Sequence, residues 1–581
     1  MDAENGTTMF PAFDRKFFDS DEDFTVIGGG ELGGKALGLA AAKRIIAESG
    51  LANEFAGLDV SIPRLTVVGT DVFEQFMTQN GLYEIASADS TDERIAHAFL
   101  QGELPPLIVG DLRALIARIT TPLAVRSSSL LEDALKHPFA GVYATKMVPN
   151  NQAAINDRFK KLAEAIKFVW ASTFFNDARC YMRTIGHDIR DERMAVVIQE
   201  VVGERFNDRF YPIVSGVVRT HNFYPTGPAG HEDGVANLAL GLGKTIVDGG
   251  VTWTYSPSYP RHAPPYASPR DLLQNTQTQL WAVNMQPARY DPISESEYLV
   301  QVGLDDAERD DVLRYTASTY DSQADRLVLG IGRKGPRALT FGPLLELDDV
   351  PLNPLIERMA KTCKDTLGCD VEIEFAMTLD RRSGLPARLG FLQVRPMMVA
   401  DEQIEVKETD LHDERALLAS DLVLGNGEST SIVDLVYVKP VAFDPKYTRV
   451  IAAEIEKFNT TLLAEQRDYA LIGFGRWGSS DPWLGIPVTW PQISGARVIV
   501  EATLPDMNVD ASQGSHFFHN MISFGVQYFT VRHSSGFAIN WDWLDRQPST
   551  AETELVRHVR LDAPLTVRVD GRRGRGVILH G

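Results

Sequence analysis

The pattern of hydrophobic and polar positions near the start of the chain predicts a strand, a turn and a helix. Residues 24–27 (FTVI) are apolar enough for a short buried strand, and residues 35–45 carry an apolar stripe at helical spacing. The connection between them, residues 28–34 (GGGELGG), is rich in glycine. A strand, a glycine-rich loop and the start of a helix form a candidate phosphate site, because the first N–H groups of a helix point at bound anions.

Further along the chain, the pattern predicts a mixed sheet and a helical region. Residues 122–125 (PLAV) predict a strand that leads into a polar patch, residues 126–129 (RSSS), and residues 151–185 have a helical pattern. The expected fold class is therefore α+β. Four more runs are typical of strands, namely residues 194–202 (MAVVIQEVV), 211–218 (YPIVSGVV), 370–379 (DVEIEFAMTL) and 389–399 (LGFLQVRPMMV).

Two polar stretches interrupt this pattern. Residues 256–292 are rich in proline and tyrosine and predict an irregular loop or insertion. Residues 401–415 (DEQIEVKETDLHDER) carry nine charges and predict a linker. We therefore expect one domain over residues 1–400 and a smaller, β-rich domain over residues 416–581.

Composition narrows the class of protein. The 581 residues are 44% hydrophobic and 23% charged, which excludes a disordered chain and predicts two to four domains. The formal net charge of -21 argues against a general binder of nucleic acids or of anionic membranes. The three cysteines, the acidic first ten residues and the lack of a long apolar run predict a soluble, cytoplasmic protein.

The glycine loop itself fits three interpretations. Gly28, Gly30 and Gly33 match the dinucleotide pattern GxGxxG, but the strand that follows lacks its acidic residue. Gly29 to Lys35 match the phosphate loop GxxxxGK, but an alanine follows where that motif needs a hydroxyl. The third interpretation is a plain glycine-rich connection with a lysine in solvent.

The order of several motifs along the chain decides between these interpretations. That order resembles the nucleotide-binding domain of the phosphoenolpyruvate synthase and pyruvate phosphate dikinase family, which has an ATP-grasp fold, and the resemblance covers roughly the first 400 residues. The motifs are residues 33–35 (GGK), 124–129 (AVRSSS), 132–133 (ED), 139–141 (FAG), 169–172 (VWAS), 199–200 (QE), 215–217 (SGV), 241–243 (GLG), 372–375 (EIEF) and 392–396 (LQVRP).

The resemblance implies a set of site residues that suits Mg-ATP. Lys35 offers a point charge and Arg126 a planar fork for phosphate oxygens, and Glu374 and Gln393 offer the hard oxygens that Mg²⁺ prefers. The implied ATP-binding residues are Lys35, Arg126, Ser127, Ser128, Gln199 and Arg395, and the implied metal ligands are Glu374 and Gln393.

Each of these residues also has a structural alternative. Arg126 with its serines would suit a helix cap, Glu374 a solvent-facing strand position, and Gln393 a buried hydrogen bond. The sequence also departs from the family at one point: Lys244 stands where the family usually has the glutamate of GLGE. This changes the local charge by two units.

The region after the linker does not suit a pyruvate-binding barrel. About 180 residues follow, whereas a (β/α)₈ barrel takes roughly 250. A swivelling-type domain would fit, because His516 precedes Gly525 at the spacing of the family's phosphohistidine segment. Phe517, Phe518 and Gln527 depart from that segment, so a structural histidine or an acceptor-binding role shared with His519 are the alternatives.

A second motif in this region is residues 473–478 (GFGRWG), followed by residues 481–487 (DPWLGIP). Glycines beside an arginine and tryptophans suit a pocket for an anionic or sugar-like ligand, and equally a turn over a core.

Taken together, the sequence predicts an ATP-dependent phosphotransferase that uses ATP and Mg²⁺, with Arg126 and His516 as catalytic residues and an unidentified small-molecule or protein acceptor. The alternatives are an ADP-forming kinase or ATP-grasp ligase, and a regulatory module that binds ATP without turnover.

Overall fold

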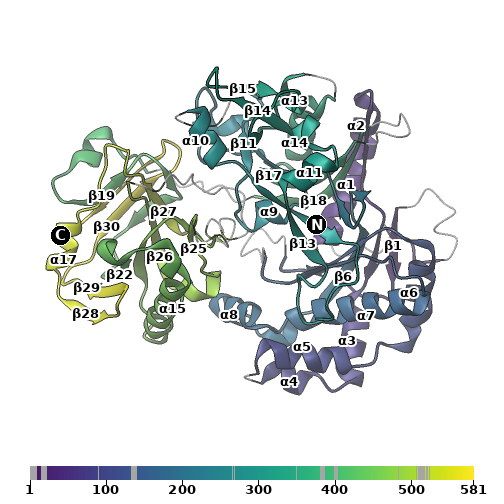
Figure 1. The fold of residues 1–581 in the computed structure, drawn as a ribbon. Helices are drawn as coiled ribbons and strands as arrows, with labels where there is room; N and C mark the ends of the chain where they lie inside the picture. Colours follow the sequence, from purple (N-terminus) through teal and green to yellow (C-terminus); the bar gives the residue numbers. More distant parts are fainter. Residues whose placement is uncertain are drawn as a thin grey trace. The chain divides into compact units, whose positions relative to one another are not determined.

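The computed structural model divides the chain into two compact units (Figure 1). The first comprises Met1–His221, Thr226–Ile246 and Val251–Met397, and the second Asn222–Pro225, Val247–Gly250 and Met398–Gly581. Among the described residues, no helix has the length and apolar character that a membrane crossing requires. The structure describes all residues except 1–9, 15–22, 89, 133–140, 263, 265, 267, 348–349, 380–386, 398–403, 480, 482, 506, 508–516, 518–520 and 522–523, and the side chain of residue 184.

A five-stranded sheet of the first unit positions the glycine loop. Its strands are mostly buried runs of apolar residues, because helices cover both faces. The first two strands are parallel, and the remaining neighbours are antiparallel. In spatial order the strands are β1 (Phe24–Ile27), β3 (Leu65–Val68), β6 (Met194–Glu200), β4 (Leu123–Ser129) and β5 (Thr145–Val148).

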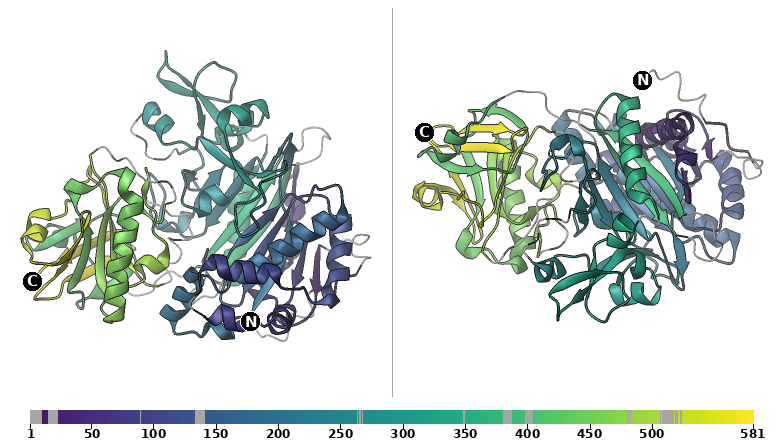
Figure 2. Two further views of the ribbon diagram at one scale, coloured as in Figure 1. Left: turned by 60° about the horizontal axis from the view of Figure 1, so that its bottom comes forward. Right: turned by 90° about the horizontal axis from the view of Figure 1, so that it is seen from above.

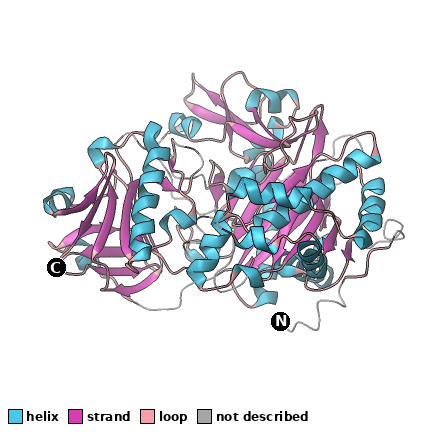
Figure 3. Cartoon of the chain, turned by 90° about the horizontal axis from the view of Figure 1, so that it is seen from below, coloured by secondary structure: helices cyan, strands magenta, loops and turns pink. Residues whose placement is uncertain are grey.

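A layer of helices covers one face of this sheet and is seen from below in Figure 3. Aromatic side chains fill the space between these helices, and the ring centroids of Phe76 and Trp170 lie 4.9 Å apart. Such aromatic clusters bury a large apolar area with defined ring geometry. The helices of this region are α3 (Thr70–Gln79), α4 (Tyr83–Ser87), α5 (Asp92–Gln101), α6 (Pro106–Arg118), α7 (Ile155–Ser172) and α8 (Asn176–Ile185).

A six-stranded, largely antiparallel sheet forms the second layer of the first unit. Only its edge strand β2 (Leu58–Ser61) pairs in parallel, with β18. One face packs against α14 (Leu352–Leu367) and α1. The other strands, in spatial order before β2, are β11 (Trp253–Tyr255), β10 (Val235–Ala239), β9 (Val214–Arg219), β17 (Val371–Thr378) and β18 (Ala387–Pro396).

Helix α1 (Gly33–Ser49) packs against both sheets and joins their cores. Two glycines allow this close approach. A Cβ atom on Gly33 would overlap the carbonyl oxygen of Ser128 in β4, and one on Gly38 would lie 2.7 Å from the carbonyl oxygen of Val394 in β18. Gly33 also has a φ of +77°, which disfavours any residue with a side chain. The helix is therefore fixed between the two sheets by backbone contacts on opposite sides.

The stretch predicted as an irregular loop, residues 256–292, is partly regular, so that prediction was wrong in its extent. It contains α10 (Pro269–Gln274) and β12 (Gln279–Asn284), because the run QLWAVN is apolar enough to pair in a sheet. β12 pairs with β13 (Leu299–Gly303) and β8 (Arg209–Tyr211), and β7 (Glu204–Phe206) completes that sheet. A further sheet consists of β15 (Arg326–Leu329), β14 (Ala317–Asp321) and β16 (Arg337–Leu339).

The second unit is built on two main sheets, a two-stranded sheet of β24 (Arg476–Trp477) and β25 (Gly485–Ile486), and one long helix, visible in green and yellow in Figure 2. Helix α15 (Thr448–Ala464) packs against the larger sheet, whose four central strands are parallel. The larger sheet has the order β20 (Val423–Leu424), β27 (Gln527–Val531), β26 (Ala496–Ala502), β23 (Tyr469–Phe474), β22 (Asp434–Val438), β29 (Val556–Arg560) and β28 (Ser549–Glu552), and the smaller one the order β19 (Ala416–Ser420), β31 (Arg575–Leu579), β30 (Thr566–Asp570) and β21 (Asn426–Ser429).

The charged run predicted as a linker differs from that expectation where it is described, over residues 404–415. Val406 and Leu411 are buried in a small core with Ala419 and Val577 of the second unit. Between them, Lys407 and Glu408 are exposed and Asp410 is half-buried, so the run is an amphipathic segment that packs on a sheet. The number of charges in this run did not indicate that Val406 and Leu411 would be buried.

Several other predicted elements are confirmed. The strands expected at residues 24–27 and 194–202 are β1 and β6, and the coarse α+β class agrees with the mixed architecture. The polar patch at residues 126–129 differs from expectation, because β4 continues through the serines to Ser129. Their side chains are buried and hydrogen-bonded, which makes strand geometry tolerable for polar residues.

The packing of α1 predicts a specific cost for a methyl group at Gly33. We expect Gly33→Ala to lower the free energy of unfolding by about 3 kcal/mol, since it adds both backbone strain and overlap with Ser128. Gly50→Ala, at the other end of the same helix, shares a positive φ but has open space around the added Cβ, so it should cost about 1 to 2 kcal/mol. If denaturant unfolding showed the same loss of unfolding free energy for both variants, the close contact between Gly33 and Ser128 would be contradicted.

Candidate active site

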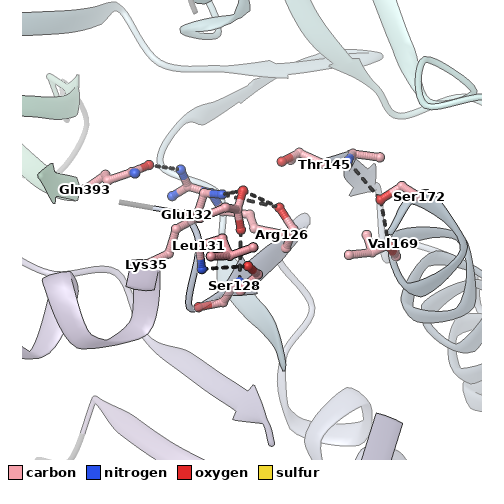
Figure 4. Close-up of polar contacts among 12 residues, drawn as sticks. Lys35, Arg126, Ser128, Leu131, Glu132, Thr145, Val169, Ser172 and Gln393 are labelled. Atoms are coloured by element: carbon pink, nitrogen blue, oxygen red, sulfur yellow. Dashed lines mark hydrogen bonds and ion pairs between the residues drawn. The ribbon is translucent and has the colours of Figure 1, made fainter. Parts of the chain in front are cut away.

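Lys35 lies in the first turn of α1, next to the serines of β4 (Figure 4). Its ammonium group forms an ion pair with the buried carboxylate of Glu132 and lies 3.3 Å from the hydroxyl oxygen of Ser127. Glu132 in turn accepts hydrogen bonds from the Ser127 hydroxyl at 2.9 Å and from the backbone N–H of Ser129 at 3.1 Å. The carboxylate is thus held by three donors, and it fixes the lysine at the start of the helix.

Ser128 has a different part in the same cluster. Its side chain is fully buried, its hydroxyl donates to the carbonyl oxygen of Leu32 at 2.8 Å, and it accepts from the N–H of Ala36 at 3.2 Å. These bonds tie the beginning of α1 to β4 and satisfy one of the helix's first N–H groups. These bonds give Ser128 a positioning role at the start of α1, and its contact with phosphate stays a prediction.

Arg126, also in β4, extends toward the six-stranded sheet (Figure 4). Its guanidinium donates to the side-chain oxygen of Gln393 at 2.9 Å and lies 3.5 Å from the carboxylate of Glu374. It also donates to the carbonyl oxygen of Leu392 at 2.8 Å and contacts the Gln199 amide oxygen at 3.4 Å. The two sheets therefore meet at this guanidinium.

A β-bulge explains why the carbonyl of Leu392 is available. In the pairing of β17 with β18, Glu374 lies opposite Gln393, but the next residue, Phe375, lies opposite Phe391, so Leu392 is the extra residue. An extra residue in one strand breaks the ladder locally and turns its backbone groups away from the neighbouring strand. Here the freed carbonyl accepts the hydrogen bond from Arg126.

A second buried charge cluster lies on the same face of the six-stranded sheet. Glu372 shares this face with Glu374, since the two are separated by one residue in β17. Its carboxylate pairs with Arg219 of β9 at 2.5 Å and with the Nε of Arg395 at 2.7 Å, and all three side chains are buried. Burial lowers the pKa of the Arg219 guanidinium, and the Glu372 charge opposes that shift. The cluster leaves one net positive charge beside Glu374 and Gln393.

The network continues from Arg219 toward the edge of the sheet. Arg219 donates to the side-chain oxygen of Asn237 at 3.2 Å, and the Asn237 amide donates to the hydroxyls of Thr252 and Thr254. A row of hydrogen-bonded polar groups therefore runs across five strands, from β11 to β18. Such a row on a buried face favours binding of a polar ligand, because an apolar face would pack better without it.

A buried acid lies behind the Lys35 cluster. Glu192 is 4% exposed, and burial raises its pKa to about 7, with the charge of Glu132 acting in the same direction and a hydrogen bond with Ser129 opposing it. The Nε2 atom of His187 lies 3.9 Å from its carboxylate, and burial also raises the pKa of the nearby Tyr143 phenol. This side of the site is therefore a region where a carboxyl group holds its proton close to neutral pH.

The predicted site residues fall into three groups in the structure. Lys35 with Ser127, and Arg126 with Gln199, Glu374 and Gln393, are each brought together by direct contacts. Arg395 lies on the adjoining charge cluster, where its contact with phosphate stays a prediction. His516 and His519 lie outside the described residues. Lys244 opens the short helix α9 (Lys244–Val247), with its ammonium 5.8 Å from the ring centroid of Trp281.

Comparison with known families agrees with this arrangement. Residues 30–416 match the family model described as the pyruvate phosphate dikinase AMP/ATP-binding domain. The chain belongs to this family. The match includes every residue of the Lys35 and Arg126 clusters and of the Glu372 cluster.

Two curated relatives of this family member are phosphotransferases by name. The "Uncharacterized phosphotransferase YvkC" of Bacillus subtilis is 24% identical over 196 residues, and the rifampicin phosphotransferase of Streptomyces sviceus is 30% identical over 213 residues. The matched stretches cover 33% and 36% of this chain. The chain therefore spans about a fifth of the length of each relative, as the alignments cover 20% of either one.

Three functional candidates in this dikinase-family domain escaped the sequence analysis. Glu372 carried a usable signal, because it alternates with Glu374 and so shares its face. Arg219 ends an apolar strand, where a charge marks a buried pair or a ligand site. Glu192 had no such signal, since its burial depends on Tyr143 and Ser129 from distant parts of the chain.

The buried acid predicts a pH-dependent contribution to stability. Between its ordinary pKa of 4.5 and about 7, the folded protein holds a proton on Glu192 that the unfolded chain has released. The free energy of unfolding should therefore fall as pH rises through this window. Glu192→Gln removes the titration, so relative to wild type it should gain about 3 kcal/mol between pH 4.5 and pH 8.

Denaturant unfolding at a series of pH values measures this difference. Glu48→Gln, an exposed acid on α1, serves as the control and should keep the wild-type pH profile. A Glu192→Gln profile parallel to wild type would show that this carboxyl does not titrate in the window.

Proposed function

We propose that this protein is an ATP-dependent phosphotransferase whose first unit binds Mg-ATP in an ATP-grasp fold. The supporting observation is that side chains from two sheets and one helix meet at a single place: Arg126 from the five-stranded sheet, Glu374 and Gln393 from the six-stranded sheet, and Lys35 from α1. In this arrangement, the polar face of the six-stranded sheet and the start of α1 both line the nucleotide site.

The triphosphate is assigned to Lys35, Arg126 and the N-terminus of α1. ATP carries about four negative charges, which the lysine, the guanidinium and the positive end of a helix dipole offset together. Helix α1 has 17 residues, and its N-terminus lies beside Lys35. Arg395 and Arg219 would add positive charge from the sheet, while Glu372 holds both in place.

The donor set also fits Mg²⁺. Glu374 and Gln393 present two oxygen atoms that both contact Arg126, so they lie on one side of the same guanidinium. Mg²⁺ is typically held by one or two protein oxygens, with phosphate and water in the remaining positions. Among the described residues, no group of three His, Cys, Asp or Glu side chains forms a metal cage, which agrees with a metal held jointly with substrate. When bound there, the metal would neutralise charge on the phosphates.

The chain's own residues would then act by positioning and by charge. Lys35 and Arg126 hold the phosphate chain for in-line attack and balance the negative charge that spreads over the transferred group. Glu132 orients the Lys35 ammonium through their ion pair. The acceptor is His516 or a bound small molecule or protein. A histidine acceptor would require the second unit to act as a swivelling-type domain.

One observation favours a regulatory module that binds ATP without turnover. Lys244 stands at the position of the family's glutamate, and its ammonium lies 5.8 Å from the ring centroid of Trp281. The exchange replaces a negative charge by a positive one, so the contacts of this position with nucleotide or phosphate would differ from those of the family. An ADP-forming kinase or ligase is the remaining alternative.

The phosphate clamp predicts which variants lose ATP-dependent turnover. We expect Arg126→Ala to lower kcat/KM for ATP by about 100-fold or more, because the charge it balances is greatest in the transition state. Lys35→Ala should weaken ATP binding as well. Arg44→Ala, an exposed change on the same helix, should leave both quantities unchanged. Loss of the Arg126 side chain without effect on ATP binding or turnover would contradict the assignment.

The products of labelled ATP separate the three forms of the proposal. We expect AMP, inorganic phosphate and an acid-labile phosphoprotein that disappears in His516→Ala, as a dikinase using a phosphohistidine would give. ADP as the only nucleotide product would indicate a kinase or ligase. Tight binding without any turnover, with and without cell extract, would indicate the regulatory module.

A further inference from the structure

Four parallel strands of the second unit end at one edge of its larger sheet. They are β22, β23, β26 and β27, and Figure 1 labels β22, β26 and β27 of this set. The carboxyl ends of neighbouring parallel strands bring residues from separate loops together, and ligands of α/β proteins bind there. Three charged residues lie at these ends: Arg476 two residues after β23, Glu501 within β26, and Arg532 directly after β27.

Glu501 is the buried residue of the three. Its side chain is 1% exposed, and its backbone pairs with Gly473 on one side and Thr530 on the other. The Tyr528 hydroxyl donates to one carboxylate oxygen, while the other has no hydrogen-bond partner among the described residues. A buried acid with an unsatisfied oxygen costs free energy, and such groups concentrate at functional sites.

The two arginines lie close enough to influence this acid. Burial raises the pKa of Glu501 to about 8, and the charges of Arg476 and Arg532 act in the opposite direction. Both arginine side chains are half-buried, so their guanidinium groups are partly desolvated and partly accessible. Arg476 donates to the carbonyl oxygen of Gly249, in the segment Val247–Gly250 of the same unit, at 3.2 Å. This bond orients the guanidinium at the strand ends.

The segment directly after β23 lies along one side of this edge. Trp477, the residue after Arg476, is buried, and its indole N–H donates to the carbonyl oxygen of Val500 at 3.1 Å. The backbone N–H of Arg476 donates to the carbonyl oxygen of Leu484 at 2.7 Å. The Arg476 backbone is therefore fixed from both directions, which is how a rigid anion site is built.

We propose that this edge binds a small molecule bearing a phosphate or carboxylate group, held between Arg476 and Arg532 and hydrogen-bonded to Glu501. A guanidinium presents a planar fork of N–H donors that matches either anion in a bidentate manner. The carboxyl group supplies a hydrogen-bond donor when it carries a proton, so the three side chains contact one anion without repulsion. The inference is independent of the ATP reaction assigned to the first unit.

Calorimetric titration of the full chain with inorganic phosphate and with citrate tests this site. The protein carries Arg126→Ala, which weakens phosphate binding at the ATP site. We expect saturable binding of at least one anion with a Kd of about 1 mM or tighter. Phosphate alone, citrate alone or both would identify the group that the site prefers, and each of these results supports the proposal.

Variants within the second unit locate the binding. Arg532→Gln should weaken it about tenfold or more, and Arg532→Lys, which keeps the charge but loses the fork, should weaken it several-fold. Arg497→Gln, an exposed arginine of β26 paired with Asp468, is the matched control and should leave the affinity unchanged. Thermal unfolding shows whether each variant is folded. If Arg532→Gln does not fold, the anion affinity of Arg532→Lys alone tests the proposal.

Two results would overturn the proposal: no binding of either anion at about 10 mM, or binding that persists in the Arg532 variants. ATP binding by the same chain without Arg126→Ala is measured in parallel. If the protein binds ATP but neither anion, only the anion site is contradicted. If it binds an anion but not ATP, only the proposed function of the first unit is contradicted.

Discussion

The first unit depends on one helix that touches backbone on both of its sides. Helix α1 can lie this close to β4 and β18 only because positions 33 and 38 carry no side chain. This contact sets the spacing between the two sheets, and the spacing decides whether Arg126 reaches Gln393 and Glu374. The same helix carries Lys35 in its first turn. The helix that joins the two hydrophobic cores therefore also brings the cations and the acids of the candidate site to one place.

The charges of this site are arranged in pairs that hold one another in position. Glu132 fixes Lys35, and Glu372 fixes Arg219 and Arg395, so these three cations are already oriented by buried acids. Buried ion pairs add little to stability, because the cost of desolvation offsets their attraction. Their value lies in preorganisation, since a cation held in place loses little entropy when an anion binds. The second unit has a related arrangement, where two arginines flank a buried acid at the ends of parallel strands.

Local pattern predicted the elements that depend on local sequence. The strand at residues 24–27 and the helix that follows the glycines were predictable from periodicity, and the order of short motifs led to the correct family. What the pattern missed depends on distant contacts. The serines of β4 looked like a polar patch because their partners, Leu32 and Glu132, are not apparent from spacing. The bulge at Leu392 and the buried Glu192 likewise arise from pairing between strands and from packing between segments far apart in the chain. The charged run at residues 404–415 packs on the second unit through two apolar residues that its charges obscured.

The central claim is that Arg126 serves a phosphate that lies between the two sheets. A crystal structure of the protein with Mg²⁺ and a non-hydrolysable ATP analogue tests it most directly. The account predicts that the Arg126 guanidinium leaves the Gln393 and Glu374 oxygens for the phosphates, and that these two oxygens turn to the metal. A nucleotide bound elsewhere, or one bound while Arg126 keeps its contacts with Gln393 and Leu392, would contradict the account.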